Sequence, residues 1–444
     1  METKKEEQPR PVRKLERGGK TESRWHWVEP SVWTDRMLEA LEAGVKGGKW
    51  HSLIDKVTRE SSLKAAWKQV EERKGGGGVD GMSIEVFSMR LDKRIARLSE
   101  QLREGTYEPQ AVKRVWIPKA DGKKRPLGVP TIIDRVVQTS IRNAIEPIFE
   151  QMFADCSYGF RPGRGCKDAL REVAAELKQG RTWVVDVDIE QYFDSINQKR
   201  LMSDVATKIA DGSLLDLIES YLEQDVMDGL KRWQPEKGTP QGAVISPLLA
   251  NLYLHPVDVE MTREGFRMVR YADDMVILCE TREEAERAHA RLHELLTARE
   301  LRLHPIKTKI VDSTIRPGFD FLGYRFFGRS RYPRPGSEKK LRDSVREKTP
   351  RTNGNSLEVI IKELNLALRG WYEYFKHSSR RAFNAIDGWV RMRLRSILRK
   401  RSKRRGRGWG LDHHRWPNAF FQQQGLFSLV QAHMKLIQSQ RPAH

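Results

Sequence analysis

Apolar residues recur at helical spacing in several stretches of the chain. Residues 50–74 carry such a stripe, formed by Leu53, Val57, Leu63, Trp67 and Val70, which predicts an amphipathic helix. We also expect helices over residues 82–105, 133–153 and 282–300. The glycine run at 75–78 interrupts the first of these patterns and predicts a flexible break.

A different pattern predicts strands. Residues 111–130 alternate apolar and basic positions around a turn at Asp121-Gly122, which predicts a β-hairpin with a basic tip. Residues 181–189 read as one strand, and residues 319–324 as the last strand of the chain. Residues 266–280 are two apolar runs divided by Ala272-Asp273-Asp274, so we expect a hairpin that carries carboxylates at its turn.

The two ends of the chain have other compositions. Residues 1–45 begin polar and charged and then become tryptophan-rich, which indicates a flexible start and a short helical element. Residues 331–348 are polar and charged and are expected to be a linker. Asn355, followed three positions later by Glu358, is typical of a helix start. Residues 391–407 are strongly basic and predict either a basic helix or a disordered tail.

Charge narrows the class of partner. Among 444 residues, 81 are lysine or arginine and 60 are aspartate or glutamate, a net charge of +21. This excess favours a polyanionic partner, with nucleic acid the first candidate and an anionic membrane surface the second. No apolar run reaches membrane-spanning length and the N-terminus lacks an apolar core, so we expect neither membrane insertion nor secretion. The three scattered cysteines, Cys156, Cys166 and Cys279, argue for a reducing, cytoplasmic compartment.

Acids within apolar strands are the strongest chemical signal. Asp186 and Asp188 interrupt a valine-rich run and share one face of the predicted strand, and Asp273-Asp274 interrupt another apolar stretch. If the two elements are neighbours, three or four carboxylates converge, a ligand set that suits Mg²⁺. Two such ions, about 3.5–4 Å apart, can activate a 3′-hydroxyl and stabilise a leaving pyrophosphate. The alternative for any single aspartate is a solvated turn residue.

Several short motifs occur together in one order. They are Ile117-Pro118-Lys119 with Arg125-Pro126-Leu127-Gly128-Val129-Pro130, Asp134-Arg135-Val136-Val137-Gln138, Ser157-Tyr158-Gly159-Phe160-Arg161-Pro162-Gly163, residues 188–194, Gly238-Thr239-Pro240-Gln241-Gly242, Ser246-Pro247-Leu248, Tyr271-Ala272-Asp273-Asp274, Lys307-Thr308-Lys309, Phe321-Leu322-Gly323 and Gly370-Trp371-Tyr372-Glu373-Tyr374-Phe375. With these motifs the chain resembles reverse transcriptases, most closely the group II intron type, also called intron maturases.

The resemblance implies an α+β, right-hand polymerase fold with fingers, a palm built on an antiparallel sheet, and a helical thumb. The expected division is an N-terminal extension over 1–45, partly disordered, fingers and palm over 46–335, and a thumb (maturase or X domain) over 336–400. Residues 401–444 would be a basic segment that binds DNA or RNA. No cysteine follows Cys279, so we expect no HNH endonuclease.

The resemblance also implies the catalytic residues. Asp188, Asp273 and Asp274 would be catalytic, and together with Ile189 they would bind two Mg²⁺ ions, with Mn²⁺ as an alternative. Asp188 is chosen over Asp186 because the family's acid lies five residues before an aromatic residue, here Phe193. Asp186 is then expected at a strand edge or in a salt bridge.

The incoming nucleotide would meet a further group of residues. Phe193 would exclude the ribose 2′-hydroxyl and so select dNTPs, although Asp194 follows immediately and a shift of one residue would reverse that selection. Contacts to the nucleotide would come from Lys119, Arg125, Gln241 and Lys307, with Lys307 as a candidate general acid for pyrophosphate and Lys309 as its rival.

Template and RNA contacts are implied at two places, first at Tyr158, Phe160 and Arg161, and then in the basic run at Arg399, Lys400 and Arg401. The function implied is RNA-directed DNA synthesis for a group II intron, with partners that include intron RNA, a DNA target and dNTPs, and with a role in splicing and mobility. The alternatives are an RNA-binding splicing cofactor with a dormant polymerase and a domesticated reverse transcriptase serving defence or repair. Retention of all three acids argues against dormancy.

Overall fold

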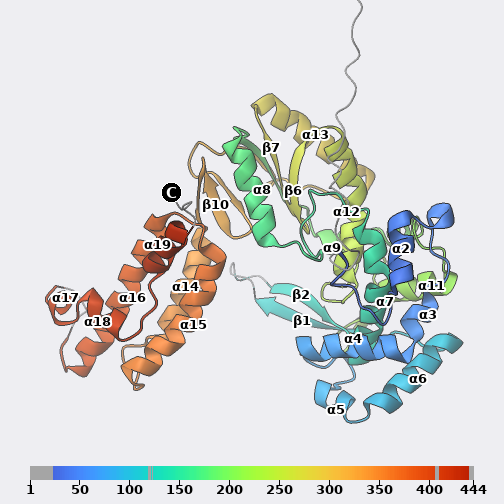
Figure 1. Cartoon of the computed structure of the whole chain (residues 1–444), viewed down its shortest axis with the longest axis horizontal. Coiled ribbons are helices and arrows are strands. Elements are labelled where there is room, and N and C mark those ends of the chain that lie inside the picture. Colours follow the sequence, from blue (N-terminus) through green and yellow to red (C-terminus); the bar gives the residue numbers. More distant parts are fainter. Residues whose placement is uncertain (1–23, 119–121, 123, 406–409, 440–444) are drawn as a thin grey trace, which may run out of the picture.

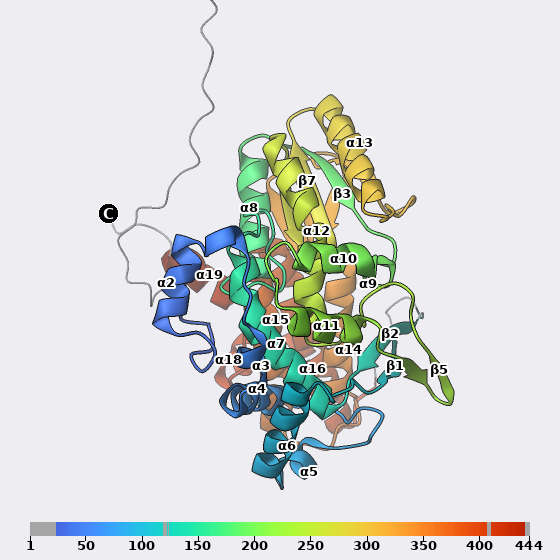
Figure 2. The same ribbon diagram turned by 90° about the vertical axis from the view of Figure 1, so that its right-hand side faces the viewer.

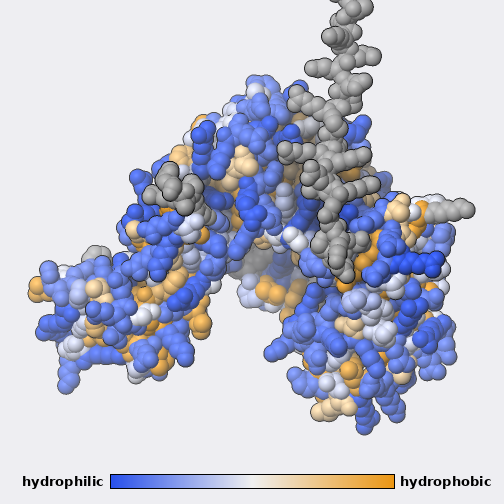
Figure 3. Space-filling view, viewed as in Figure 1, coloured by the Kyte–Doolittle hydropathy of each residue, from blue (hydrophilic) through white to orange (hydrophobic). Residues whose placement is uncertain are grey.

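The computed structural model describes residues 24–118, 122, 124–405 and 410–439. Three parts form an arch: a helical part with a projecting hairpin, a central sheet with its helices, and a second helical part (Figure 1). These are the fingers, the palm and the thumb of the predicted α+β, right-hand fold. Figure 3 shows a wide hollow between the thumb and the fingers, beneath the palm.

The fingers are mainly helical. Their elements are α2 (Asp35–Ala43), η1 (Lys46–Gly48), α3 (Ile54–Thr58), α4 (Glu60–Arg73), α5 (Ile84–Ser88), α6 (Leu91–Glu104), β1 (Val112–Pro118), β2 (Lys124–Val129), α7 (Ile132–Glu150), α11 (Gly212–Leu222), β4 (Val226–Asp228) and β5 (Lys231–Trp233). The strands form one sheet in the order β2-β1-β4-β5, with β1 and β2 antiparallel. The predicted hairpin over 111–130 is therefore confirmed.

Two of the predicted helices are each divided. The pattern over 50–74 forms α3 and α4, which are separated at Arg59, where ψ is 137°. The pattern over 82–105 forms α5 and α6, with Arg90 non-helical between them. In both cases the apolar stripe continues across the break, because both halves bury it against the same core. Periodicity therefore located the helical regions but not their interruptions.

Residues 24–45 belong to the packed core of the fingers. Trp25, Val32 and Trp33 are buried in the same hydrophobic cluster as α7. The Trp33 indole Nε1 donates to the Asn143 carbonyl of α7 at 3.0 Å. The described part of the expected N-terminal extension is thus continuous with the fingers.

The palm is a four-stranded antiparallel sheet with the order β6-β7-β3-β8. Its elements are α8 (Cys166–Lys178), β3 (Trp183–Val187), α9 (Tyr192–Ser195), α10 (Gln198–Val205), α12 (Ser246–Arg263), β6 (Arg267–Tyr271), β7 (Asp274–Cys279), α13 (Arg282–Ala298) and β8 (Lys309–Asp312). One face packs on α12 and α13 (Figures 1 and 2). The other face packs on α8 and on a small sheet of β9 (Phe319–Phe321), β10 (Tyr324–Phe327) and β11 (Ser330–Pro333).

The linker predicted over residues 331–348 is wrong. The segment begins in β11 and continues as helix α14 (Pro335–Lys348). Pro335 occupies the first helical turn, where proline is favourable because its missing N–H would have no helical partner. Leu341 and Val345, one turn apart, bury the inner side of the helix in the thumb core. A narrow apolar stripe on a very polar helix made this segment look like a linker.

The thumb extends to the last described residue. It contains α14, α15 (Leu357–Phe375), α16 (Arg380–Arg401), α17 (Asp412–Arg415), α18 (Asn418–Gln423) and α19 (Leu429–Ser439). Helix α15 starts at the cap Ser356, one residue after the predicted Asn355. Phe421 and Leu429 lie in the same hydrophobic cluster as α15 and α16. Residues 410–439 therefore pack as part of the thumb and not as a separate segment beyond residue 400.

Candidate active site

The acidic turn between β6 and β7 is a tight hairpin. Tyr271 pairs with Asp274, so only Ala272 and Asp273 form the loop. Ala272 has φ of +58°, a conformation that fits the twist of a two-residue hairpin but is uncommon for a residue with a side chain. The turn thus carries Asp273 at its tip and Asp274 at the first position of β7.

The sheet register brings the second acidic strand beside this turn. Strand β3 runs antiparallel to β7 and pairs Val187 with Met275. One position further along that register, Asp188 lies opposite Asp274. Because side chains alternate along a strand, Asp186 and Asp188 share a face, and both line the same hollow as Asp273 and Asp274. The predicted convergence of the acids is confirmed.

This hollow has a volume of about 550 Å³. Besides the four acids, it is lined by Val187, Ile189, Ile306, Lys307, Lys309, Asp320, Leu322 and Arg334. Two of these, Asp320 and Arg334, were missed at the level of sequence. Asp320 interrupts an apolar strand as Asp186 does, so the same signal could have found it. Arg334 had no such signal, because it lies in the segment taken for a linker.

Crowding raises the proton affinity of the acids. Burial, followed by the charges of Asp186 and Asp273, raises the pKa of Asp274 to about 7. Burial also raises the pKa of Asp186 to about 6, although Lys309 opposes this shift. The lining itself contains five aspartates and three cations, Lys307, Lys309 and Arg334, so the hollow is a suitable environment for an added cation.

Two lysines already face the acids. Lys307 Nζ lies 3.2 Å from each carboxylate oxygen of Asp188. Lys309 Nζ lies 3.6 Å from Asp186, which confirms the expected salt bridge, although β3 is an interior strand and not an edge. The backbone of Asp188 is fixed by His304, whose N–H donates to its carbonyl at 2.8 Å.

A second group of predicted residues meets beside strand β2 of the β1–β2 hairpin. Arg125 Nε donates to Gln241 Oε1 at 3.0 Å. Gly242 allows this approach, because a Cβ at that position would lie 2.4 Å from the Gly128 carbonyl oxygen. Arg125 and Gln241 are therefore neighbours, as a shared nucleotide site requires. Lys119 lies outside the described residues.

Phe193 and Asp194 occupy different surroundings. The Phe193 side chain is only 8% exposed, and its carbonyl accepts from the Thr239 N–H at 2.9 Å. Asp194 lines a small pocket together with Arg114 and Gln241. Both residues thus border the loop that contains Thr239 and Gln241. The Phe193 ring is buried, whereas the Asp194 carboxylate lines the pocket.

The loop containing residues 157–161 lies against the acidic turn. Phe160 is 49% exposed and its ring centroid lies 6.3 Å from that of Tyr271. Arg161 is buried, and its guanidinium donates to Glu150 at 3.0 Å and to the Ala154 carbonyl at 2.7 Å. The prediction that Arg161 contacts the template is therefore corrected, since its donors hold the loop. Tyr158 and Phe160 keep accessible surface.

Residues 391–401 of the basic run lie in helix α16, as one of the two predictions had it for this part, and their cations differ in role. Arg395 is buried and donates to the Trp416 carbonyl at 2.9 Å and to Asn418 Oδ1 at 2.9 Å. Arg399 is 2.7 Å from Asp412, which is almost fully buried. Arg399 therefore has a structural partner, and its contact with RNA stays a prediction. Lys400 and Arg401 are exposed, although Arg401 also donates to the Asn353 carbonyl at 3.2 Å.

Comparison with known proteins agrees with this geometry. The family described as reverse transcriptase (RNA-dependent DNA polymerase) matches residues 117–326, and the group II intron maturase-specific domain matches residues 338–416. Protein YkfC of Escherichia coli (strain K12) is 32% identical over 384 residues, which are 77% of this chain and 95% of that protein. The chain belongs to the group II intron-encoded reverse transcriptases. By family it is an RNA-directed DNA polymerase joined to a maturase domain.

Other relatives share a smaller part. The group II intron-encoded protein LtrA of Lactococcus lactis subsp. cremoris is 38% identical over 184 residues, which are 41% of this chain and 31% of LtrA. A chain of a partial Cas6-RT-Cas1–Cas2 complex matches with a TM-score of 0.35 and 25% identity, over 56% of this chain and 42% of that chain. The family assignment rests on the sequence matches.

Reverse transcriptases of this family use divalent metal ions, and the carboxylates of the hollow have the right donor chemistry. Asp188, Asp273 and Asp274 supply hard oxygen atoms, which Mg²⁺ prefers. Within the ranges that the structure describes, no group of three or more His, Cys, Asp or Glu side chains is arranged so that it could hold a metal ion. Lys307 instead pairs with Asp188. In the same described ranges, no helix is both long and apolar enough to cross a membrane.

Proposed function

We propose that this reverse transcriptase extends a primer 3′-hydroxyl with dNTPs on an RNA template in the hollow of the palm. The observation that supports this most is the convergence of Asp188, Asp273 and Asp274 on one sheet face, beside Lys307 and Arg334. The carboxylates provide the negative site that metal-dependent nucleotidyl transfer needs, and the two cations provide contacts for phosphate.

Two Mg²⁺ ions would be held by the carboxylates of Asp188, Asp273 and Asp274 and by the main chain at Ile189. When bound, they would supply positive charge to the attacking hydroxyl and to the phosphate oxygens. The raised pKa of Asp274, about 7, fits this assignment, because a carboxylate crowded by others is stabilised in its ionised form by a nearby cation.

The chain's own residues would orient the nucleotide. Arg125 has a planar guanidinium suited to triphosphate oxygens, and its hydrogen bond to Gln241 directs it to the loop that borders the pocket. Lys307 would donate a proton to the departing pyrophosphate, since its ammonium lies beside Asp188 and its side chain is largely exposed to an incoming substrate. Phe193 would limit the space for a ribose 2′-hydroxyl.

The thumb would bind structured RNA. Its match to the maturase-specific domain covers residues 338–416, and its exposed cations include Lys400, Arg401, Lys403, Arg404 and Arg405. Phosphate contacts of this kind carry most of the affinity of proteins for nucleic acids. We therefore propose that the thumb holds the intron RNA during splicing, while the palm copies RNA during mobility.

Primer extension on an RNA template tests the polymerase. Wild-type protein with Mg²⁺ is expected to extend the primer with dNTPs and not with NTPs. The Asp273→Asn variant, which retains the size of the side chain but loses its charge, should not extend. A folded wild-type protein that binds RNA but does not extend the primer would instead support the alternative function, a splicing cofactor with a dormant polymerase. Taken alone, the match to the maturase-specific domain favours that alternative.

A further inference from the structure

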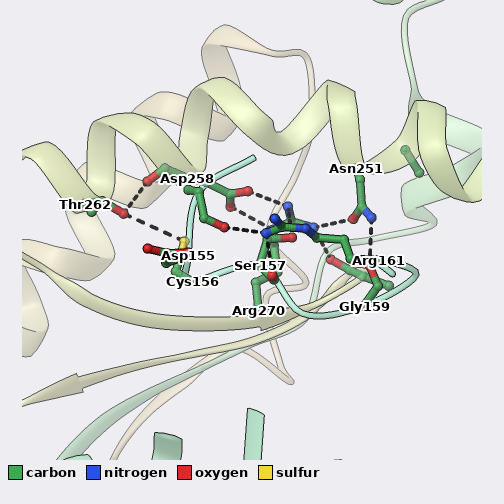
Figure 4. Close-up of polar contacts among 12 residues, drawn as sticks. Asp155, Cys156, Ser157, Gly159, Arg161, Asn251, Asp258, Thr262 and Arg270 are labelled. Atoms are coloured by element: carbon green, nitrogen blue, oxygen red, sulfur yellow. Dashed lines mark hydrogen bonds and ion pairs between the residues drawn. The ribbon is translucent and has the colours of Figure 1, made fainter. Parts of the chain in front are cut away.

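Arg270 lies in the interior immediately before the catalytic turn. It is on β6, one residue before Tyr271, and its side chain is fully buried. Its guanidinium is surrounded by polar partners from three elements, namely α12, the loop before α8, and the turn itself (Figure 4). Burying a charged side chain is costly unless it is paired and hydrogen-bonded, so the partners of Arg270 decide what it does.

All five N–H donors of this guanidinium are used. Nε donates to Asp258 Oδ1 at 2.7 Å, and one Nη2 hydrogen goes to the other oxygen of Asp258. Nη1 donates to Asn251 Oδ1 and to the Ala272 carbonyl, each at 2.9 Å, and Nη2 also donates to Ser157 Oγ at 2.8 Å. Burial alone would lower the pKa of Arg270, but Asp258 more than offsets this, so the pKa lies above its ordinary value.

One of these bonds acts directly on the catalytic turn. The Ala272 carbonyl belongs to the residue with φ of +58°, a conformation that is unfavourable for a non-glycine residue and persists only when its surroundings enforce it. The guanidinium thus holds the peptide that joins Ala272 to Asp273, and with it the position of the Asp273 carboxylate.

The same network holds the loop of Tyr158 and Phe160. Asn251 accepts from Arg270 and donates through Nδ2 to the Gly159 carbonyl at 2.7 Å. Gly159 in turn packs on the turn, because a Cβ there would lie 2.4 Å from Ala272 N. The backbone adds two bonds of 2.8 Å, from Tyr158 N to the Arg270 carbonyl and from Arg270 N to the Cys156 carbonyl.

We propose that Asn251 and Arg270 are positioning residues for DNA synthesis, which hold Asp273 in place and join the acidic turn to the loop of residues 157–161. Both side chains are buried, so they would not touch nucleotide or primer. They act through the Ala272 peptide on one side and the Gly159 backbone on the other. This inference rests on the proposed role of Asp273 in catalysis.

The first test is Asn251→Ala, which removes both side-chain bonds of Asn251 and leaves the Arg270–Asp258 pair intact. Primer extension should show kcat reduced by about ten- to a hundredfold, as a misplacement of ~1 Å at a reacting centre can cause. The Mg²⁺ concentration for half-maximal rate should rise, while affinity for primer–template measured without metal stays within about twofold of wild type. Asn251→Ala should remain folded at the assay temperature, as measured by thermal melting.

The second test adds a methyl group against the turn. Gly159→Ala pushes directly on the Ala272 backbone and should change kcat and the Mg²⁺ requirement in the same direction. Gly165→Ala is the matched control, because a Cβ at Gly165 would meet only Asp168, at 3.9 Å. It should behave as wild type.

The outcomes separate this inference from the proposed function. If wild-type protein extends the primer and both variants match its kcat and Mg²⁺ dependence, the inference is wrong and the proposed function stands. If the variants lose primer–template affinity and melting temperature without any change in Mg²⁺ dependence, the network is merely structural, which also overturns the inference. Failure of the wild-type protein to extend would contradict the proposed function itself.

Discussion

Lys307 holds both carboxylate oxygens of Asp188 at 3.2 Å, although 119 residues separate the two in the sequence. The ion pair places a proton donor at the edge of the acidic hollow, beside the residue predicted to bind metal. Lys309, two residues later, contacts Asp186 instead. The two lysines that the motif left as rivals are thus directed to different acids.

This arrangement predicts unequal effects of removing the two lysines. Lys307→Ala should lower kcat for primer extension by about a hundredfold, which is the lower range for loss of a general acid. Lys309→Ala serves as the matched control and should change kcat much less. A single-turnover measurement of the chemical step, made for both variants and for wild type, checks this. A larger effect in Lys309→Ala would make Lys309 the acid.

The raised pKa values predict how stability depends on pH in metal-free protein. The folded pKa values of Asp274 and Asp186, about 7 and about 6, exceed the ordinary value of 3.8. The folded state therefore binds these protons more tightly than the unfolded state, so their contribution to stability is complete below about pH 4 and is lost as pH rises toward 7.

Thermal melting in the presence of a chelator should show this loss between about pH 4 and pH 7. The Asp274→Asn variant cannot ionise and should have a flatter profile. Added Mg²⁺ should raise the melting temperature of wild type most at the upper end of this range. An identical pH profile for wild type and Asp274→Asn would contradict the predicted shift.

Phe193 and Asp194 give opposite predictions for sugar selection. If Phe193 faces the 2′ position, Phe193→Val should raise NTP incorporation relative to dNTP by about tenfold or more, whereas Asp194→Asn should not. Because Phe193 is 8% exposed, the smaller side chain also leaves a void, so melting temperatures must accompany the kinetics. Altered selectivity in Asp194→Asn alone would mean that the gate lies one residue later.

The bond between Arg125 and Gln241 predicts coupling between them. Arg125→Ala and Gln241→Ala should each raise KM for dNTP, and the double variant should show less than the sum of the two effects. Residues that share a hydrogen bond typically couple by about 0.5–3 kcal/mol. A double-mutant cycle on kcat/KM measures this coupling, and strict additivity would show that the two side chains act independently.

Arg399 and Lys400 are neighbours on α16, and we expect different roles for them: Arg399 stabilises the thumb and Lys400 binds RNA. Arg399→Ala leaves the buried carboxylate of Asp412 without its partner and should lower the melting temperature of the thumb. Lys400→Ala should leave the melting temperature unchanged and weaken RNA binding, with a shallower dependence on salt. Titrations with a structured RNA at several salt concentrations check both variants, and a wild-type affinity independent of salt would contradict a phosphate-binding surface.

The local elements followed from the sequence because they depend on near neighbours. The hairpin around Ala272-Asp273 appears where the two apolar runs predicted it, and the strand predicted over 181–189 is present as the shorter β3, Trp183–Val187. Strand alternation also placed Asp186 and Asp188 on one face. The family motifs identified the thumb, but the very polar helix α14 was mistaken for a linker, since its buried stripe contains few apolar residues.

The sequence by itself was enough to predict the family and the acidic hairpin, because both depend on the residue types at neighbouring positions of strands and turns. Only the tertiary structure decided which charged side chains are buried. Arg161, Arg270 and Arg395 look like surface cations in the sequence, but all three are buried. Arg161 finds its partners within 11 residues, whereas Arg270 and Arg395 take theirs from other elements, such as Ser157, which lies 113 residues from Arg270. Burying a guanidinium costs least where its donors have partners, and for Arg270 and Arg395 that condition depends on how separate elements pack.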